Sequence, residues 1–150
     1  MPSAKTNCFV DTNILVYAVD PAEREKQPLV SDLLRRLIRD QRLVLSVQSL
    51  NECYRVITDR RQIMPRERAR TFISILAPSC TAPFGYGVTR EAWRLQDAAG
   101  YSFWDCMLLG SALLAGCTLF LSEDMRHGHK LNGLTIMSPF EADFAGHFSF

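Results

Sequence analysis

The chain has 150 residues, a size that fits one folded domain over residues 1–150. Hydrophobic residues make up 47% and charged residues 22%, which excludes a disordered, collagen-like or coiled-coil protein. The formal net charge of +1 indicates no partner by itself. Five cysteines without a C-x-x-C pair are typical of a reducing compartment. No apolar leader precedes Cys8, and Gly116 interrupts the longest apolar run. We therefore expect a cytoplasmic protein without a membrane segment.

Short apolar runs and amphipathic segments alternate through the first half of the chain. In chain order we expect a strand at 8–10, a short helix at 14–19, a helix at 27–39, a strand at 43–47, and helices that begin at Ser49 and Pro65. The helix at 27–39 is the clearest of these, because Leu29, Leu33 and Leu37 share one stripe and arginines occupy the other side.

The second half continues the alternation. We expect a strand at 80–84, a turn at 85–87, a helix at 89–99 that ends at Gly100, a buried helix at 103–115, and strands at 118–121 and 134–137. Strands that alternate with helices predict an α/β fold, in which a mostly parallel sheet of four or five short strands is flanked by helices. Ligands of such sheets bind outside the carboxyl ends of the strands.

Four carboxylates stand at the junctions between predicted elements. Asp11 directly follows the first strand, and Asp124 follows the strand at 118–121. Glu52 and Asp105 each stand three residues after a serine that can begin a helix. That spacing is also typical of a capping box, so each of these two acids has a structural interpretation beside the functional one.

As a set, the four carboxylates indicate a cation. Several carboxylates at one edge of a sheet repel one another unless a positive ion compensates them. Ligation by oxygen alone selects hard cations such as Mg²⁺ or Mn²⁺. Such ions activate water and stabilise the leaving oxygen when a phosphodiester is hydrolysed. The sequence therefore predicts a magnesium or manganese site.

Several segments resemble a PIN domain, and they follow one another in order. The segments are residues 9–13, the helix that carries Glu52, residues 101–105, and residues 122–125. The spacings are 41 residues from Asp11 to Glu52, 53 to Asp105 and 19 to Asp124. Residues 133–140 resemble the closing strand of VapC-type toxins. The resemblance covers nearly the whole chain.

This resemblance implies a metal-dependent endoribonuclease that acts as the toxin of a type II toxin–antitoxin pair. By analogy Asp11, Glu52, Asp105 and Asp124 are catalytic and hold Mg²⁺ or Mn²⁺. Either Glu123 or Asp124 can face the metal, and the family pattern favours Asp124. A metal-activated water hydrolyses RNA phosphodiester bonds and leaves a 5′-phosphate. The resemblance further implies a transfer RNA or ribosomal RNA substrate, a VapB-like antitoxin and a homodimer. Three polar residues match positions that orient the ligands or the water: Thr12, Asn13 and Ser122.

A basic stretch follows the Glu52 helix. Six arginines against two acids give residues 55–70 a local charge of +4. Arg60, Arg61 and Arg66 are therefore predicted to contact the RNA backbone, because basic surfaces attract polyanions. The alternative is a solvated face without a ligand.

Other functions fit the residues less well. His127-x-His129 lacks the further cysteine or histidine that a structural zinc site needs. A phosphatase with a strand-end nucleophile would want a second aspartate two residues on, where this chain has Asn13. Two alternatives within the PIN fold remain open. One is a module that binds RNA or a partner without cleavage, and the other is a nuclease of RNA processing or DNA metabolism.

Overall fold

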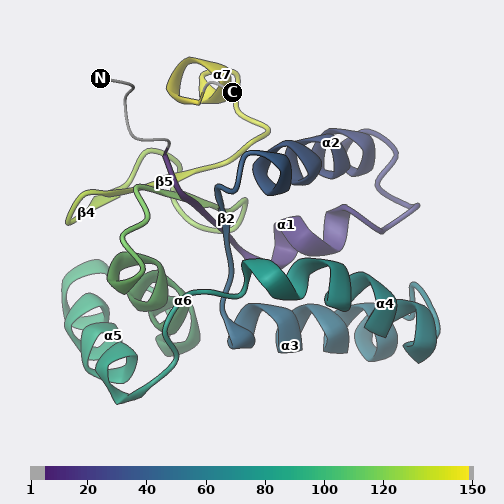
Figure 1. Cartoon of the computed structure of the whole chain (residues 1–150). Helices are drawn as coiled ribbons and strands as arrows, with labels where there is room; N and C mark the ends of the chain where they lie inside the picture. The colour runs from purple at the N-terminus through teal and green to yellow at the C-terminus, as the bar shows by residue number, and fades with distance from the viewer. Residues whose placement is uncertain (1–5, 149–150) are drawn as a thin grey trace.

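A five-stranded sheet forms the centre of the computed structural model, which describes residues 6–148 (Figure 1). The strands are β1 (Cys8–Val10), β2 (Leu43–Val44), β3 (Leu119–Leu121), β4 (Lys130–Leu131) and β5 (Leu134–Met137). Their order across the sheet is β2-β1-β3-β5-β4, and every pair is parallel except β4 with β5. The predicted mostly parallel α/β sheet is confirmed.

Helices cover both faces of this sheet (Figure 1). They are α1 (Thr12–Tyr17), α2 (Lys26–Arg39), α3 (Val47–Arg55), the π-helical turn η1 (Val56–Arg60), α4 (Arg66–Leu76), the 3-10 turn η2 (Ala77–Ser79), α5 (Tyr86–Ala99), α6 (Phe103–Leu114) and α7 (Phe144–His147). Helices α1 to α4 lie on one side, whereas α5 and α6 pack together on the other.

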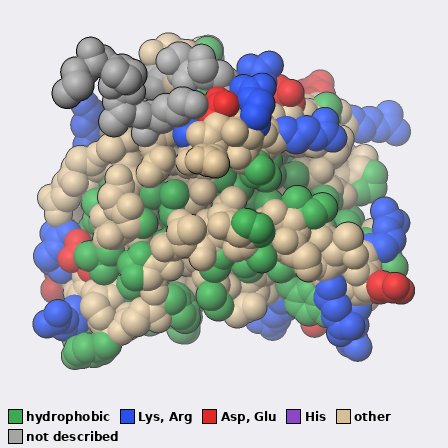
Figure 2. Space-filling model, in the orientation of Figure 1, with side chains coloured by type: hydrophobic (Ala, Val, Ile, Leu, Met, Phe, Trp, Pro, Cys, Tyr) green, Lys and Arg blue, Asp and Glu red, His purple; other side chains and the backbone are tan. Residues whose placement is uncertain are grey.

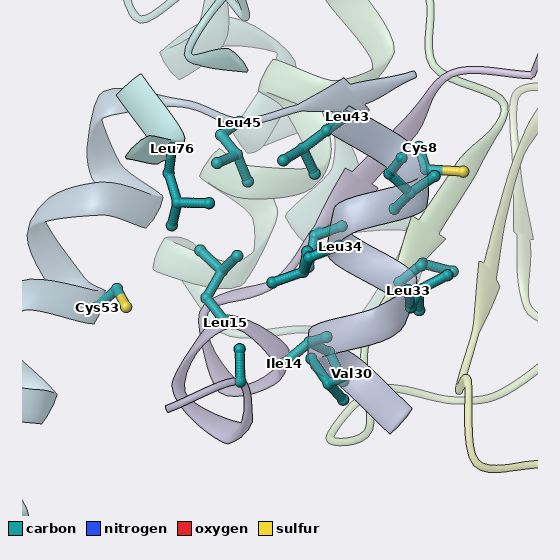
Figure 3. Packing of buried hydrophobic residues seen from close by; sticks show 14 of the residues in the cluster. Cys8, Ile14, Leu15, Val30, Leu33, Leu34, Leu43, Leu45, Cys53 and Leu76 are labelled. Carbon is teal, nitrogen blue, oxygen red and sulfur yellow. The ribbon is translucent and has the colours of Figure 1, made fainter. Parts of the chain in front are cut away.

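The central strands bury both of their faces, as strands between two helical layers must. Cys8 and Val10 belong to the core under α1 to α4, whereas Phe9 between them belongs to the core under α5 and α6. Phe9 stacks on Phe120 of the neighbouring strand with ring centroids 5.2 Å apart. Figure 3 shows the first core, where Leu33 and Leu34 of α2 lie beside Cys8 and Leu43 of the sheet.

Several helix starts differ from the sequence prediction. Helix α1 spans Thr12–Tyr17 rather than 14–19. Helix α3 begins at Val47 rather than Ser49, because the Ser46 hydroxyl caps it by accepting a hydrogen bond from the Ser49 amide. Pro65 is the N-cap of α4 instead of its first residue. Helix α5 begins at Tyr86 rather than 89 and has Gly85 as its N-cap, so the turn expected at 85–87 is wrong.

Three strand predictions also differ. The strand expected at 43–47 is shorter, since β2 covers only Leu43–Val44 and α3 begins at Val47. The strand expected at 80–84 is wrong, since Cys80 forms a single bridge to Leu45 and the 3-10 turn η2 precedes it. Strand β4 was missed by the sequence analysis. It forms a hairpin with β5 through Asn132 and Gly133, whose φ angles of 47° and 86° suit a tight turn that asparagine and glycine favour.

The surface in Figure 2 shows lysine and arginine side chains mostly around the rim of this face, with hydrophobic and uncharged atoms over its centre. This side of the molecule therefore carries no continuous basic surface over its centre. Within residues 6–148, no helix has both the length and the apolar character that a membrane crossing requires.

Candidate active site

The candidate site lies beside β1, where the order of strands across the sheet reverses. The chain leaves β1 for β2 on one side, whereas β3 pairs with β1 on the other, and such a switch point opens a crevice at the carboxyl ends of the strands. Asp11 follows β1 and caps α1, and its amide donates to the Leu121 carbonyl over 2.9 Å. The segment 122–124 begins where β3 ends. The first and last predicted acids are thus brought to one edge.

All four predicted carboxylates line a single cavity of about 580 Å³ at this edge. They come from separate parts of the fold: the start of α1, the middle of α3, the start of α6 and the segment after β3. The lining residues are Asp11, Thr12, Asn13, Val16, Tyr17, Glu52, Arg55, Val56, Arg60, Arg61, Asp105 and Asp124.

Asp11 is the most deeply buried of these acids, with 6% of its surface exposed. One carboxylate oxygen accepts from the Thr12 amide at 2.7 Å, and the other accepts from the Ser122 hydroxyl at 2.8 Å. Burial nevertheless raises the pKa of Asp11 to about 7, and the nearby charges of Asp105 and Asp124 add to the increase. The ionised form of Asp11 is unfavourable in this buried position among other carboxylates, and a bound cation would stabilise it.

Glu52 does not close the start of a helix. Since α3 begins at Val47 and is capped by Ser46, Glu52 lies in the helix interior and the capping interpretation is wrong. Its carboxylate accepts one hydrogen bond from the Thr12 hydroxyl and another from the Gln48 amide, each at 2.9 Å. Gln48 also donates to the Trp104 carbonyl at 3.1 Å, which connects α3 to the start of α6. These contacts hold the Glu52 side chain toward the cavity.

Asp105 combines the two interpretations. Ser102 is the N-cap of α6, and its hydroxyl accepts from the Asp105 amide at 3.2 Å, so the predicted cap is present. The Asp105 side chain also lines the cavity. Partial burial raises its pKa, and the charges of Glu52 and Asp124 act in the same direction, against the hydrogen bond from Ser102.

Asp124 and its neighbour Glu123 have different surroundings in the structure. Asp124 lines the cavity, whereas the Glu123 carboxylate is 2.5 Å from the ammonium of Lys26 at the start of α2. Although burial alone would raise the pKa of Glu123, Lys26 and the Tyr17 hydroxyl lower it. Glu123 therefore anchors the segment after β3 to α2 and leaves Asp124 to face the cavity.

The three polar residues predicted to support the site take different positions. Thr12 and Asn13 line the cavity, whereas Ser122 lies beneath it. The Ser122 hydroxyl donates to Asp11 and accepts from the Asp124 amide at 3.2 Å, so it connects two of the acids. Both polar side-chain atoms of Asn13 are buried without a partner among the described residues. An unpartnered amide of this kind is available to a ligand.

Arginines form another wall of the same cavity. Arg60 and Arg61 line it, but Arg66, the first residue of α4, does not. Arg55 lines it as well and was not singled out from the sequence, although it begins the basic stretch. Asp20 was also missed: it is buried and accepts from Arg61 Nη1 at 2.9 Å.

The donor set fits a hard divalent cation. Four carboxylates and the hydroxyl of Thr12 offer oxygen alone, which Mg²⁺ and Mn²⁺ prefer. No three His, Cys, Asp or Glu side chains within residues 6–148 converge as a ready-made metal cluster, so the acids share a cavity without touching. His127 and His129 bond to other groups instead: His127 lies 2.8 Å from the Asp143 carboxylate, and His129 lies 2.7 Å from the Tyr101 hydroxyl.

A model of the PIN domain family matches residues 8–130, which include all four acids. The chain belongs to the PIN domain family. Its fold is similar to VapBC2 from Rickettsia felis, a structure bound to a DNA fragment from its promoter, with a TM-score of 0.62 and 14% identity over 87% of this chain and 97% of that one.

The fold is also similar to VapC20 from Mycobacterium tuberculosis, which is described as a sarcin-ricin loop cleaving toxin. Here the TM-score is 0.55, with 18% identity over 79% of this chain and 92% of the other. At such identities the two structures establish a shared PIN fold. A comparison with curated protein sequences finds no match.

Ser122 provides a test of how the acids of this PIN domain are held. We expect Ser122→Ala to weaken Mn²⁺ binding about tenfold, because partners that orient metal ligands typically contribute this much to affinity. The loss removes a hydrogen bond that lowers the pKa of Asp11. Isothermal titration calorimetry measures the change. Ser111→Ala is the matched control, since Ser111 is equally buried but donates to the Pro83 carbonyl. Equal affinities in both variants would contradict the expectation.

Proposed function

We propose that this PIN domain is an endoribonuclease dependent on Mg²⁺ or Mn²⁺, and that it acts as the toxin of a toxin–antitoxin pair. The observation that carries the proposal is the single cavity lined by Asp11, Glu52, Asp105 and Asp124, which come from four separate parts of the fold. Carboxylates that lie in one cavity repel one another. Their convergence from separate elements is explained better by a shared cation than by helix capping.

The residues of the chain divide the chemistry among them. Asp11, Glu52, Asp105 and Asp124 would hold the metal. When bound, Mg²⁺ or Mn²⁺ supplies Lewis acidity, activates water and neutralises charge at the scissile phosphate. Ser122 fixes the orientation of Asp11, while Thr12 does the same for Glu52. Asn13 has an amide without a protein partner and could orient the attacking water or a substrate oxygen.

The comparisons support the substrate and the partner. VapC20 is described as cleaving the sarcin-ricin loop, and VapBC2 is named as a complex and bound to promoter DNA. By this likeness we propose ribosomal or transfer RNA as the substrate, a VapB-like antitoxin as the partner, and a cytoplasmic homodimer as the assembly. Light scattering on the purified protein tests the homodimer.

Cleavage of total cellular RNA by the purified protein tests the proposed activity. Parallel reactions contain Mg²⁺, Mn²⁺ or EDTA, and the products are mapped at their 5′ ends. We expect discrete fragments in the presence of either metal and none with EDTA. Fragments that persist in EDTA would contradict metal dependence. Metal binding without any cleavage, even of ribosomes and transfer RNA, would favour a module that binds RNA without cutting it.

A further inference from the structure

The cavity contains a second set of charged groups that the metal site does not use. Arg55, Arg60 and Arg61 line it together with the four carboxylates. Although these arginines share the cavity with four carboxylates, no ion pair within residues 6–148 engages Arg55 or Arg60. Two of the three guanidinium groups are thus available to an anion that enters the cavity.

Local backbone geometry brings these arginines to one place. Helix α3 ends at Arg55 and continues directly into the π-helical turn η1, so that the chain widens before it reaches Arg60 and Arg61. Short π-helical segments commonly occur at functional sites, where they change the direction of side chains. In a regular helix, residues 55 and 60 would point about 140° apart. Here both side chains line the same cavity.

Asp20 restrains the third arginine. Its carboxylate is buried, accepts from the Ala22 amide at 3.0 Å and contacts Arg61 Nη1 at 2.9 Å. A guanidinium group has five donors, so this contact leaves most of them for a ligand. About half of the Arg61 side chain, 47%, remains exposed. Arg61 is therefore oriented in advance, which lowers the entropy lost when it binds.

The charge of the cavity fits a phosphate only when a cation is present. Four carboxylates outnumber three guanidinium groups, so a metal-free cavity repels anions once the acids are ionised. One divalent cation reverses that balance. Arginine binds phosphate oxygens through two parallel N–H groups, which makes it well suited to a nucleic-acid backbone.

We infer that Arg55, Arg60 and Arg61 form a subsite for a non-scissile phosphate of the RNA, the one adjacent to the bond that the carboxylate site cleaves. The inference deepens the proposed function and rests on it for the position of the scissile bond. Contacts to the phosphate position the strand without reading its sequence. The subsite thus sets which linkage reaches the carboxylates.

The first experiment measures binding without cleavage. It uses the Asp11→Asn/Asp105→Asn protein, which lacks two of the carboxylates that repel RNA, and a fluorescent single-stranded RNA of ten nucleotides. Fluorescence anisotropy gives the affinity at several salt concentrations. We expect Arg55→Gln and Arg60→Gln each to weaken binding about tenfold, as for a hydrogen bond to a charged group. The salt slope should fall by about 0.7 for each lost phosphate contact.

Arg68→Gln is the matched control. It removes the same charge from the same basic stretch, but Arg68 is exposed on α4 and does not line the cavity. Affinities of the Arg55 and Arg60 variants within twofold of this control would overturn the inference. Failure of the parent protein to bind RNA at low salt would overturn it as well. Thermal unfolding confirms that each variant is folded.

A second measurement places the phosphate. A single neutral methylphosphonate replaces each linkage of the RNA in turn. At one linkage next to the cleavage site, we expect the methylphosphonate to weaken binding to the parent protein about tenfold. The same methylphosphonate should not weaken binding to the Arg60→Gln variant any further, because the phosphate and Arg60 are the two partners of one contact. Additive losses at every linkage would contradict a defined subsite. If binding behaves as expected but the wild-type protein cuts no RNA, the nuclease proposal fails, and the three arginines form a phosphate-binding site without a scissile bond beside it.

Discussion

The Asp11→Asn protein should cleave RNA at least about a thousandfold more slowly than the wild type while it keeps its fold. Asp11 is the buried acid of the cavity, and both of its oxygens are hydrogen-bonded on the protein side. An amide of the same shape preserves packing but carries no charge for a cation. Single-turnover cleavage of the mapped RNA measures the loss, and Asp32→Asn, at an exposed position on α2, is the control. Cleavage within tenfold of the wild type would contradict a metal site at Asp11.

The same substitution should stabilise the metal-free protein at pH 8. Because burial raises the pKa of Asp11 from 3.8 to about 7, its ionisation in the folded protein is unfavourable at alkaline pH. The stability that this group contributes is present below pH 4 and is lost as the pH rises through about 7. We expect a net gain of about 2 kcal/mol for Asn at pH 8, which vanishes near pH 4. Urea unfolding in EDTA gives the comparison, and a variant that is less stable at pH 8 would contradict it.

Periodicity in the sequence was enough to predict the layers of the fold. Three-residue strands such as Cys8–Val10 are apolar throughout because helices cover both faces, and the sequence shows that as a short run. Boundaries were harder to predict, since Ser46 and Ser49 both suit an N-cap. The structure has Ser46 at the N-cap, and this moves Glu52 from a helix start to the helix interior.

Three acids of the site, Asp11, Asp105 and Asp124, could be predicted because each lies near the point where an element begins or ends. Glu52 lies inside α3 and was predicted through the resemblance of its helix to a PIN domain. The residues that orient these acids could not be predicted. The contact between Gln48 and Glu52 joins two positions of one helix, but its link to the Trp104 carbonyl spans 56 residues. Lys26 and Glu123 are 97 residues apart, and their ion pair is what separates Glu123 from Asp124. No pattern within a short stretch of the sequence predicts these pairings. They follow from the order of strands in the sheet, which the sequence analysis did not determine.

Metal binding and protonation should compete at Asp11. In the metal-free protein the raised pKa, about 7, keeps this carboxyl largely protonated under mildly acidic conditions. A cation must displace that proton, so its apparent affinity falls by up to about tenfold for each pH unit below 7. We expect Mn²⁺ to bind about a hundredfold more weakly at pH 5 than at pH 7, with little change above pH 8. Partial burial also raises the pKa of Asp105, which steepens the fall.

Calorimetry in two buffers of different ionisation enthalpy tests this linkage directly, because it counts the protons released on binding. At pH 6 we expect about one proton per Mn²⁺ from the wild-type protein and a smaller number from Asp11→Asn, which has no carboxyl at this position. The remaining release in that variant reports Asp105. Equal Mn²⁺ affinities at pH 5.5 and pH 7.5 would show that the cation is not held by Asp11, and the position of the metal would then have to be sought among Glu52, Asp105 and Asp124.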